Sequence, residues 1–221
     1  GIVMLIPHTF HEDDHTYRVE GEYVLSTSAV IELCGMSDMS QVPSENLRWA
    51  SARGTAVHLA VEAYETYRDP IEAINDFCLL NDIDVSETAT ARFKLYEKWR
   101  DQHEVVLAGK MEIPRVYRHV GNELLIGATL DMPCFIDGAL TILDLKTCHP
   151  QYGEKLKTLR LKWNAQTWSY AEALEADDDF WGDNPKIQPQ RMVLHLHEDC
   201  GKTGVKGEAL GYKEHIFNDD F

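Results

Sequence analysis

The sequence has no long apolar run and no closely spaced pair of cysteines. No stretch approaches the roughly 20 apolar residues that a membrane-spanning helix needs, and the first residues lack the basic flank of a secretory signal. The five cysteines are scattered and none belongs to a C-x-x-C motif, so neither a zinc site nor a disulfide framework is indicated. We therefore expect no membrane contact and a reducing, cytoplasmic setting.

Basic residues are also scarce. Lys and Arg number 21 against 37 Asp and Glu, which gives a formal net charge of −16. This balance argues against a protein that binds nucleic acid through its overall charge, although a local basic surface can still do so. The length of 221 residues and the 44% of hydrophobic residues suit one globular domain. We expect a single domain over residues 1–221, with its core at about 46–200.

Helical patterns dominate the first half of the chain, and strand patterns follow them. A hairpin around Glu20–Gly21 precedes a short helix capped near Ser26. Further helices are expected at about 46–67, 70–80 and 86–102, and strands at 105–117, 123–136 and 139–147. A polar, basic connection then leads to a helix at about 161–176 and to strands at 191–197 and 211–217. This order predicts a mixed α/β sandwich in which helices flank one central sheet.

Two aspartates in the stretch LDMPCFIDGALTILDLKT are predicted to face each other. Asp137–Gly138 between two apolar runs is a strong signal for a two-residue hairpin turn. Such a turn pairs Ile136 with Ala139. Counting outward from that pair brings Asp131 opposite Asp144, with Cβ atoms about 5 Å apart. Because two carboxylates at this distance repel, a divalent cation between them gives the pairing a purpose.

Lys146 lies two residues beyond Asp144, so strand alternation points it to the same face. A lysine beside a metal-bound water can orient that water or stabilise charge on a scissile phosphate. Phosphodiester hydrolysis is the reaction that most needs this arrangement. The alternative is a pair of solvated charges on an exposed sheet. Pro133 leaves room for it, because a bulge there would shift the register and separate the two carboxylates.

Four motifs, in this order and spacing, resemble those of the PD-(D/E)XK nuclease superfamily, and in particular its RecB-like branch. The D-x-K motif lies in ILDLKT, and the acidic motif G-x-x-D appears as GATLD, with its aspartate one residue later than usual. The histidine motif matches RGTAVHLAVEAY, and Q-x-x-x-Y appears as QTWSY. D-x-K or Q-x-x-x-Y alone is weak, but all four in order are specific. They contribute His58, Asp131, Asp144, Lys146, Gln166 and Tyr170.

The resemblance implies a restriction-endonuclease-like core, with a mixed central β-sheet flanked by helices, that hydrolyses DNA with Mg²⁺ or Mn²⁺. Imidazole together with carboxylates suits Mn²⁺ as well as Mg²⁺. Relatives that hold an iron–sulfur cluster carry four cysteines flanking the core, and because this chain has no such set, we expect no cluster. The implied metal ligands are the side chains of His58, Asp131 and Asp144 and the backbone carbonyl of Leu145.

Two glutamates are candidates for the surroundings of the metal. Glu62 lies one helical turn after His58 and on the same face, where it could be a ligand, a partner that orients His58, or a surface charge. Glu112, on a neighbouring strand, resembles a recurrent acid of the family, and whether it lies in the site is left open. Gln166 and Tyr170 share one helix face, and with the resemblance we expect them to contact a substrate phosphate or to support Lys146.

The basic residues gather beside the D-x-K motif. A charge run is ordinarily a solvated face, but this one adjoins the expected metal site and is interleaved with aromatic residues, so we expect it to contact the DNA backbone. The acidic remainder would repel DNA elsewhere. The expected DNA-binding residues are Lys155, Lys157, Arg160 and Lys162 in this run, to which Arg53, leading into the His58 helix, could add.

Two late histidines invite a second metal site. His195 and His197 alternate on the strand expected at 191–197, so both point to one face. No third ligand is apparent from the sequence. We therefore expect both to be packed side chains.

The expected activity is that of an exonuclease acting on DNA ends in recombination, repair or phage DNA processing. Stand-alone relatives in this branch often work beside a single-strand annealing protein, some as rings, so such a partner and a homo-oligomer are implied by analogy. One alternative is a structure-specific or single-strand endonuclease. Another is a catalytically silent DNA-binding subunit on the same fold, against which the intact set of Asp131, Asp144 and Lys146 argues.

Overall fold

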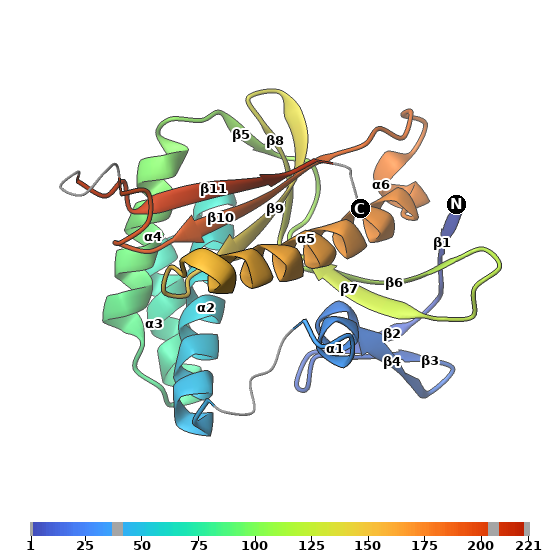
Figure 1. The fold of residues 1–221 in the computed structure, drawn as a ribbon, viewed down its shortest axis with the longest axis horizontal. Helices are drawn as coiled ribbons and strands as arrows, with labels where there is room; N and C mark the ends of the chain where they lie inside the picture. The colour runs from blue at the N-terminus through green and yellow to red at the C-terminus, as the bar shows by residue number, and fades with distance from the viewer. Residues whose placement is uncertain (1, 37–41, 203–207, 219–221) are drawn as a thin grey trace.

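The computed structural model describes residues 2–36, 42–202 and 208–218. It is a mixed α/β structure in which helices flank two sheets, where the sequence led us to expect one central sheet (Figure 1). The six-stranded sheet has the order β1-β6-β7-β4-β3-β2 and contains Val3–Leu5, Ile113–His119, Ile126–Leu130, Glu22–Ser26, Thr16–Val19 and Thr9–His11. The five-stranded sheet has the order β11-β10-β9-β8-β5 and contains Tyr212–Phe217, Gln190–Leu196, Ala139–Lys146, Met132–Ile136 and Val105–Leu107.

The helices cover both faces of the five-stranded sheet. On one face, α2, α3 and α4 form a core with that sheet in which Phe93, Trp99, Leu143 and Leu145 are buried. On the other face, α5 crosses β10 and β11 and continues onto the six-stranded sheet, so that one helix bridges the two sheets (Figure 1). The helices are α1 (Thr27–Leu33), α2 (Ser44–Glu65), α3 (Pro70–Asn81), α4 (Ser86–Arg100), α5 (Gly153–Glu175) and α6 (Asp178–Trp181).

The predicted hairpin turn at Asp137–Gly138 is confirmed. Both residues have positive φ, +49° and +85°, as a type I′ turn requires. Ile136 pairs with Ala139, and the ladder continues outward to Met132 and Leu143. Pro133 lies inside this ladder without shifting its register. The same count places Asp131 opposite Asp144, one position beyond the last pair of this ladder.

The strands expected at 105–117 and 123–136 are each divided in two, and this is why there are two sheets. Leu107 pairs with Cys134 in one sheet, and Ile113 pairs with Leu130 in the other. Between these pairs, residues 108–112 stand against residues 131–133, so one side carries two extra residues. Such a bulge bends both strands, and a left-handed Glu112 (φ +55°) marks it. Apolar periodicity carries no sign of a bulge, so the sequence predicted one continuous strand on each side.

The basic segment expected as a connection before residue 161 is helical. Helix α5 begins at Gly153 and includes all of GEKLKTLRLKW. Leu156, Leu159 and Trp163 have helical spacing, and Leu159 packs against the buried cluster that contains Trp163. The charged residues between them had obscured this pattern. Among the described residues, no helix has the length and apolar character needed to cross a bilayer.

Candidate metal centre

Asp131 and Asp144 lie where the two sheets meet. Asp131 stands between β7 and β8, at the point where the chain passes from one sheet to the other, and Asp144 lies near the end of β9. Both side chains are buried, with relative exposures of 7% and 1%. The backbone N–H of Leu145 donates to Asp131 Oδ2 at 3.0 Å, which holds that carboxylate against β9. The bulge thus places the side chain of Asp131 beside β9, the strand that carries Asp144.

His58 reaches the same place from helix α2. Its Nε2 lies 3.4 Å from Asp131 Oδ2 and 3.2 Å from the carbonyl oxygen of Leu145. Ala56 and Ala60 on the same helix are fully buried, and their small side chains let α2 approach the sheet. Three of the four expected ligands, His58, Asp131 and the Leu145 carbonyl, are therefore in contact.

The fourth expected ligand, Asp144, faces Lys146. Lys146 Nζ lies 2.7 Å from Asp144 Oδ2, and this confirms that the two side chains share a face. Within the described part of the chain, both carboxylate oxygens of Asp144 are buried without a hydrogen-bond partner, and Oδ2 has only its ion pair with Lys146. A buried carboxylate oxygen without a donor is costly unless a cation or water satisfies it. The residues present therefore fit a bound divalent cation.

The charges around His58 and Asp144 also favour a bound divalent cation. Burial raises the pKa of Asp144 to about 7; Lys146 opposes this rise, and Asp131 adds to it. Burial by itself would lower the pKa of His58, but the carboxylates of Asp131, Glu112 and Asp144 outweigh it and raise that pKa to about 10. An excess of acid around one imidazole is the environment that a divalent cation neutralises.

The two glutamates considered for the surroundings of the metal have different partners. Glu112 Oε1 lies 3.3 Å from His58 Nδ1, on the ring nitrogen opposite the one that faces Asp131. Glu62 Oε1 instead lies 3.6 Å from the guanidinium of Arg68, an exposed residue just beyond the end of α2. Glu112, and not Glu62, is the acid that can orient His58. His58, Glu112 and Asp131 form a group whose ligand atoms all lie within 4.8 Å of one another, and the expected ligand Asp144 lies outside that group.

Gln166 and Tyr170 cover the Asp144 face from α5. Gln166 Nε2 donates to the Tyr170 hydroxyl at 2.7 Å, and both side chains are buried. Burial, followed by the charges of Asp144 and Asp131, raises the pKa of Tyr170 well above its usual range, so the phenol stays protonated as a donor. Among the described residues, Gln166 Oε1 is buried without a hydrogen-bond partner. One helix face thus presents polar atoms toward the carboxylates.

The expected DNA-binding residues divide between different surfaces. Lys162 lies one turn before Gln166 on the same face of α5, and Lys155 lies two turns before Lys162. Burial and then the nearby charge of Lys146 lower the pKa of Lys162, which indicates that the two ammonium groups are neighbours. Lys155 is exposed.

The other three have local partners. Lys157 pairs with Glu154 at 2.6 Å on the outer side of α5. Arg160 turns to β11, where it lies 3.0 Å from His215 Nδ1 and packs over Phe217. Arg53 on α2 lies over the ring of Trp49, with 5.2 Å from guanidinium carbon to ring centroid.

The glycine of the GATLD motif has a role that sequence reasoning missed. The ring of Tyr17 packs directly on Gly127, so a Cβ at that position would overlap the ring. The Tyr17 hydroxyl is hydrogen-bonded to Thr129 on the same strand. The N-terminal hairpin is therefore fastened to the strand that leads into Asp131.

Compared with known proteins, the chain matches no protein-family model, no curated protein and no solved structure.

Proposed function

We propose that this protein is a metal-dependent nuclease that hydrolyses DNA phosphodiester bonds, with a restriction-endonuclease-like core. The observation that carries the proposal is the convergence of two buried aspartates, a histidine and a lysine at the junction of the two sheets. Two carboxylates, an imidazole and a backbone carbonyl offer mainly oxygen atoms, which suits Mg²⁺ or Mn²⁺.

His58, Asp131, Asp144 and the Leu145 carbonyl would hold the cation, and Glu112 would keep His58 oriented. When bound, the ion supplies charge that polarises a phosphate and lowers the pKa of a coordinated water. The residues of the chain provide the rest of the chemistry.

Lys146 is the group closest to the reacting atoms in this proposal. Its ammonium would orient the attacking water or stabilise the negative charge that develops on the phosphate. The buried carboxylate of Asp144 holds it by an ion pair of 2.7 Å. Tyr170 and Gln166 supply neutral polar atoms on the same face and would contact a phosphate oxygen.

Lys162 and Lys155 would extend this surface along α5, where DNA phosphates could lie. An acidic remainder, with a net charge of −16 over the chain, would keep the rest of the molecule away from DNA. We propose an exonuclease that acts on DNA ends. A single-strand annealing partner, a ring-like homo-oligomer and a cytoplasmic location stay predictions.

A cleavage assay on two substrates tests the proposal. Linear duplex DNA labelled at either end, and a covalently closed circle, are incubated with the protein and Mn²⁺ or with a chelator, and Asp144→Asn serves as the control. We expect metal-dependent loss of the linear substrate, an intact circle and an inactive variant. Cleavage of the circle would make the protein an endonuclease. Absence of cleavage by a folded protein that binds DNA would favour the catalytically silent subunit and overturn the proposal.

A further inference from the structure

A second group of potential metal ligands lies just beyond the ends of β9 and β10. These two strands are parallel, with Lys146 paired to His195, so the chain leaves both at the same edge of the sheet. His149 follows β9, and His197 and Asp199 follow β10. The carboxyl ends of neighbouring parallel strands are where side chains from separate segments converge on a ligand.

The three side chains are in contact. Their ligand atoms all lie within 4.8 Å of one another, and the rings of His149 and His197 meet edge to face with centroids 4.8 Å apart. Asp199 Oδ2 lies 3.7 Å from His149 Nε2 and 4.0 Å from His197 Nδ1. In a tetrahedral zinc site the ligand atoms are about 3.3 Å apart, since each bond is about 2.0–2.1 Å long. The two distances from Asp199 Oδ2, 3.7 and 4.0 Å, exceed that spacing by less than about 1 Å.

Two of the three ligands, His149 and Asp199, already have outer partners of the kind that orient metal ligands. His149 Nδ1 lies 2.8 Å from the carbonyl oxygen of Pro150, which leaves the Nε2 lone pair directed at Asp199. Asp199 Oδ1 holds Lys202 at 2.8 Å, so Oδ2 is the oxygen that faces both rings.

The turn that carries His197 is fixed by backbone hydrogen bonds. The His197 N–H donates to Gly211, and its carbonyl accepts from Cys200. The lone pair of His197 Nδ1 accepts the Asp199 N–H at 3.0 Å, and a metal ion would replace that bond.

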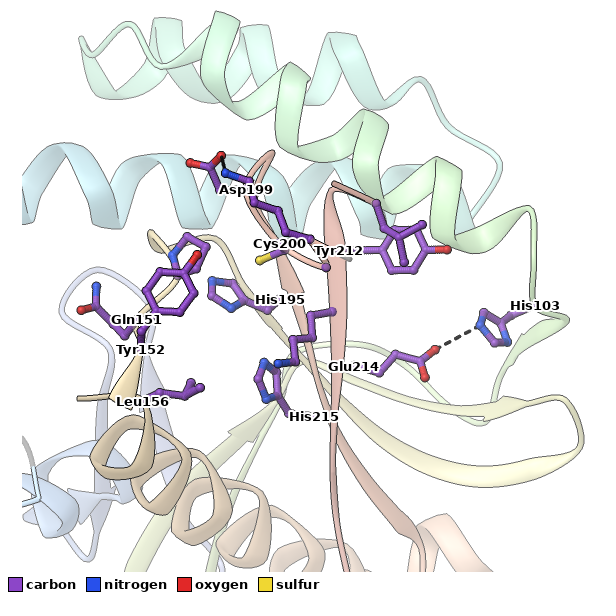
Figure 2. Close-up of a pocket in the computed structure, with 15 residues that line it drawn as sticks. His103, Gln151, Tyr152, Leu156, His195, Asp199, Cys200, Tyr212, Glu214 and His215 are labelled. Carbon is purple, nitrogen blue, oxygen red and sulfur yellow. Dashed lines mark ion pairs between the residues drawn. The ribbon is translucent and has the colours of Figure 1, made fainter. Parts of the chain in front are cut away.

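The surroundings are compatible with a cation. Arg92 comes close to His197, but its guanidinium is paired with Glu198. Asp199 lies at the rim of a pocket of about 650 Å³ that Tyr152, His195 and His215 also line, so water or a small ligand can reach it (Figure 2). His195 belongs to the packed side chains, as expected, because its Nε2 lies 2.6 Å from the Cys148 carbonyl.

We propose that His149, His197 and Asp199 form a zinc site, with three protein ligands and a fourth position for water. Two imidazoles and one carboxylate favour Zn²⁺ over Mg²⁺, because nitrogen ligands suit zinc and oxygen ligands suit magnesium. The ion would fasten the segment after β9 to the turn between β10 and β11. From the sequence alone we expect His197 to be a packed side chain, because its two partners in this set, His149 and Asp199, come from a different strand end and from the turn after β10. The site is independent of the proposed nuclease activity.

Zinc titration of the metal-free protein tests the proposal. The number and affinity of bound Zn²⁺ ions are measured by competition with a chromophoric chelator, in excess Mg²⁺, for the parent protein, His149→Gln and Asp199→Asn. His149 is 64% exposed, so its replacement leaves the core unchanged. His11→Gln, which removes an exposed imidazole in the other sheet, is the matched control.

We expect the parent and His11→Gln to bind one more zinc ion than His149→Gln, or to bind that ion at least about 10-fold more tightly; Asp199→Asn should behave as His149→Gln does. Zinc should also raise the melting temperature more in the parent than in His149→Gln. Asp131→Asn, which alters only the first cluster, should keep the ion. Equal binding by His149→Gln and the parent, or a parent protein that binds no zinc in this assay, would overturn the site.

Discussion

The two clusters of histidine and acid use similar residue types but sit in different environments. The first, around His58, Asp131 and Asp144, is buried where the two sheets meet and contains a lysine in contact with a carboxylate. The second, around His149, His197 and Asp199, is partly exposed, and its lysine, Lys202, lies on the outer oxygen of Asp199. The burial of the side chains and the ratio of oxygen to nitrogen among the ligand atoms decide which metal ion each cluster suits. The first suits charge stabilisation beside two buried carboxylates with Mg²⁺ or Mn²⁺, and the second suits a zinc ion that fastens two segments.

The largest expected effect is the difference in cleavage rate between variants of the two lysines, Lys146 and Lys202. Lys146→Ala should slow cleavage by on the order of 10²–10³, because loss of one preorganised donor in a buried site typically costs that much. Lys202→Ala, which removes the corresponding lysine of the second cluster, should leave the rate unchanged. Single-turnover cleavage at saturating Mn²⁺ is the measurement. A Lys146→Ala protein that binds Mn²⁺ and DNA normally and cleaves at the parental rate would remove Lys146 from the mechanism.

A smaller effect is expected from the acid that orients His58. Glu112→Gln should weaken Mn²⁺ binding by about 10–100-fold, because outer partners of a ligating histidine typically contribute that much to metal affinity. Glu62→Gln is the matched control, since Glu62 pairs with Arg68 and should not affect the metal. Calorimetric titration with Mn²⁺ compares the two variants. Equal affinities would mean that Glu112 has no part in the centre.

The smallest expected effect concerns DNA binding along α5. Lys162→Gln should reduce the slope of log K for DNA against log salt by about 0.9, the value for one lost phosphate contact on duplex DNA. Lys157→Gln, on the outer side of the same helix, should leave that slope unchanged because Lys157 is paired with Glu154. Binding is measured with the inactive Asp144→Asn protein as background. If Lys157→Gln has the larger effect, the DNA lies on the opposite side of α5.

The local parts of the first cluster could be predicted from the sequence. The Asp137–Gly138 turn determines its own register, and strand alternation then aligns Asp144 with Lys146. These features depend on residues close together in the chain. The choice between Glu62 and Glu112 could not be made, because it depends on a bulge that the apolar pattern does not record.

The rest of the fold depended on long-range pairing. The division into two sheets arises from the two extra residues at 108–112, and the second cluster arises from the parallel pairing of β9 with β10. Neither the extra residues nor the parallel pairing produces a periodic pattern in the sequence. The start of α5, in contrast, has a periodic pattern, because Leu156, Leu159 and Trp163 have helical spacing. The charged residues between them favour a polar connection, and that expectation is wrong.

The central claim is that the first cluster is a metal centre that uses Asp131 and Asp144. Calorimetric titration of the metal-free protein with Mn²⁺ tests it most directly, with Asp131→Asn and Asp144→Asn compared against His149→Gln. The asparagine variants keep the size of the side chain and remove its charge. We predict one Mn²⁺ ion in the first cluster of the parent and of His149→Gln, and its loss in both asparagine variants. Unchanged Mn²⁺ affinity in Asp131→Asn and Asp144→Asn would contradict the account.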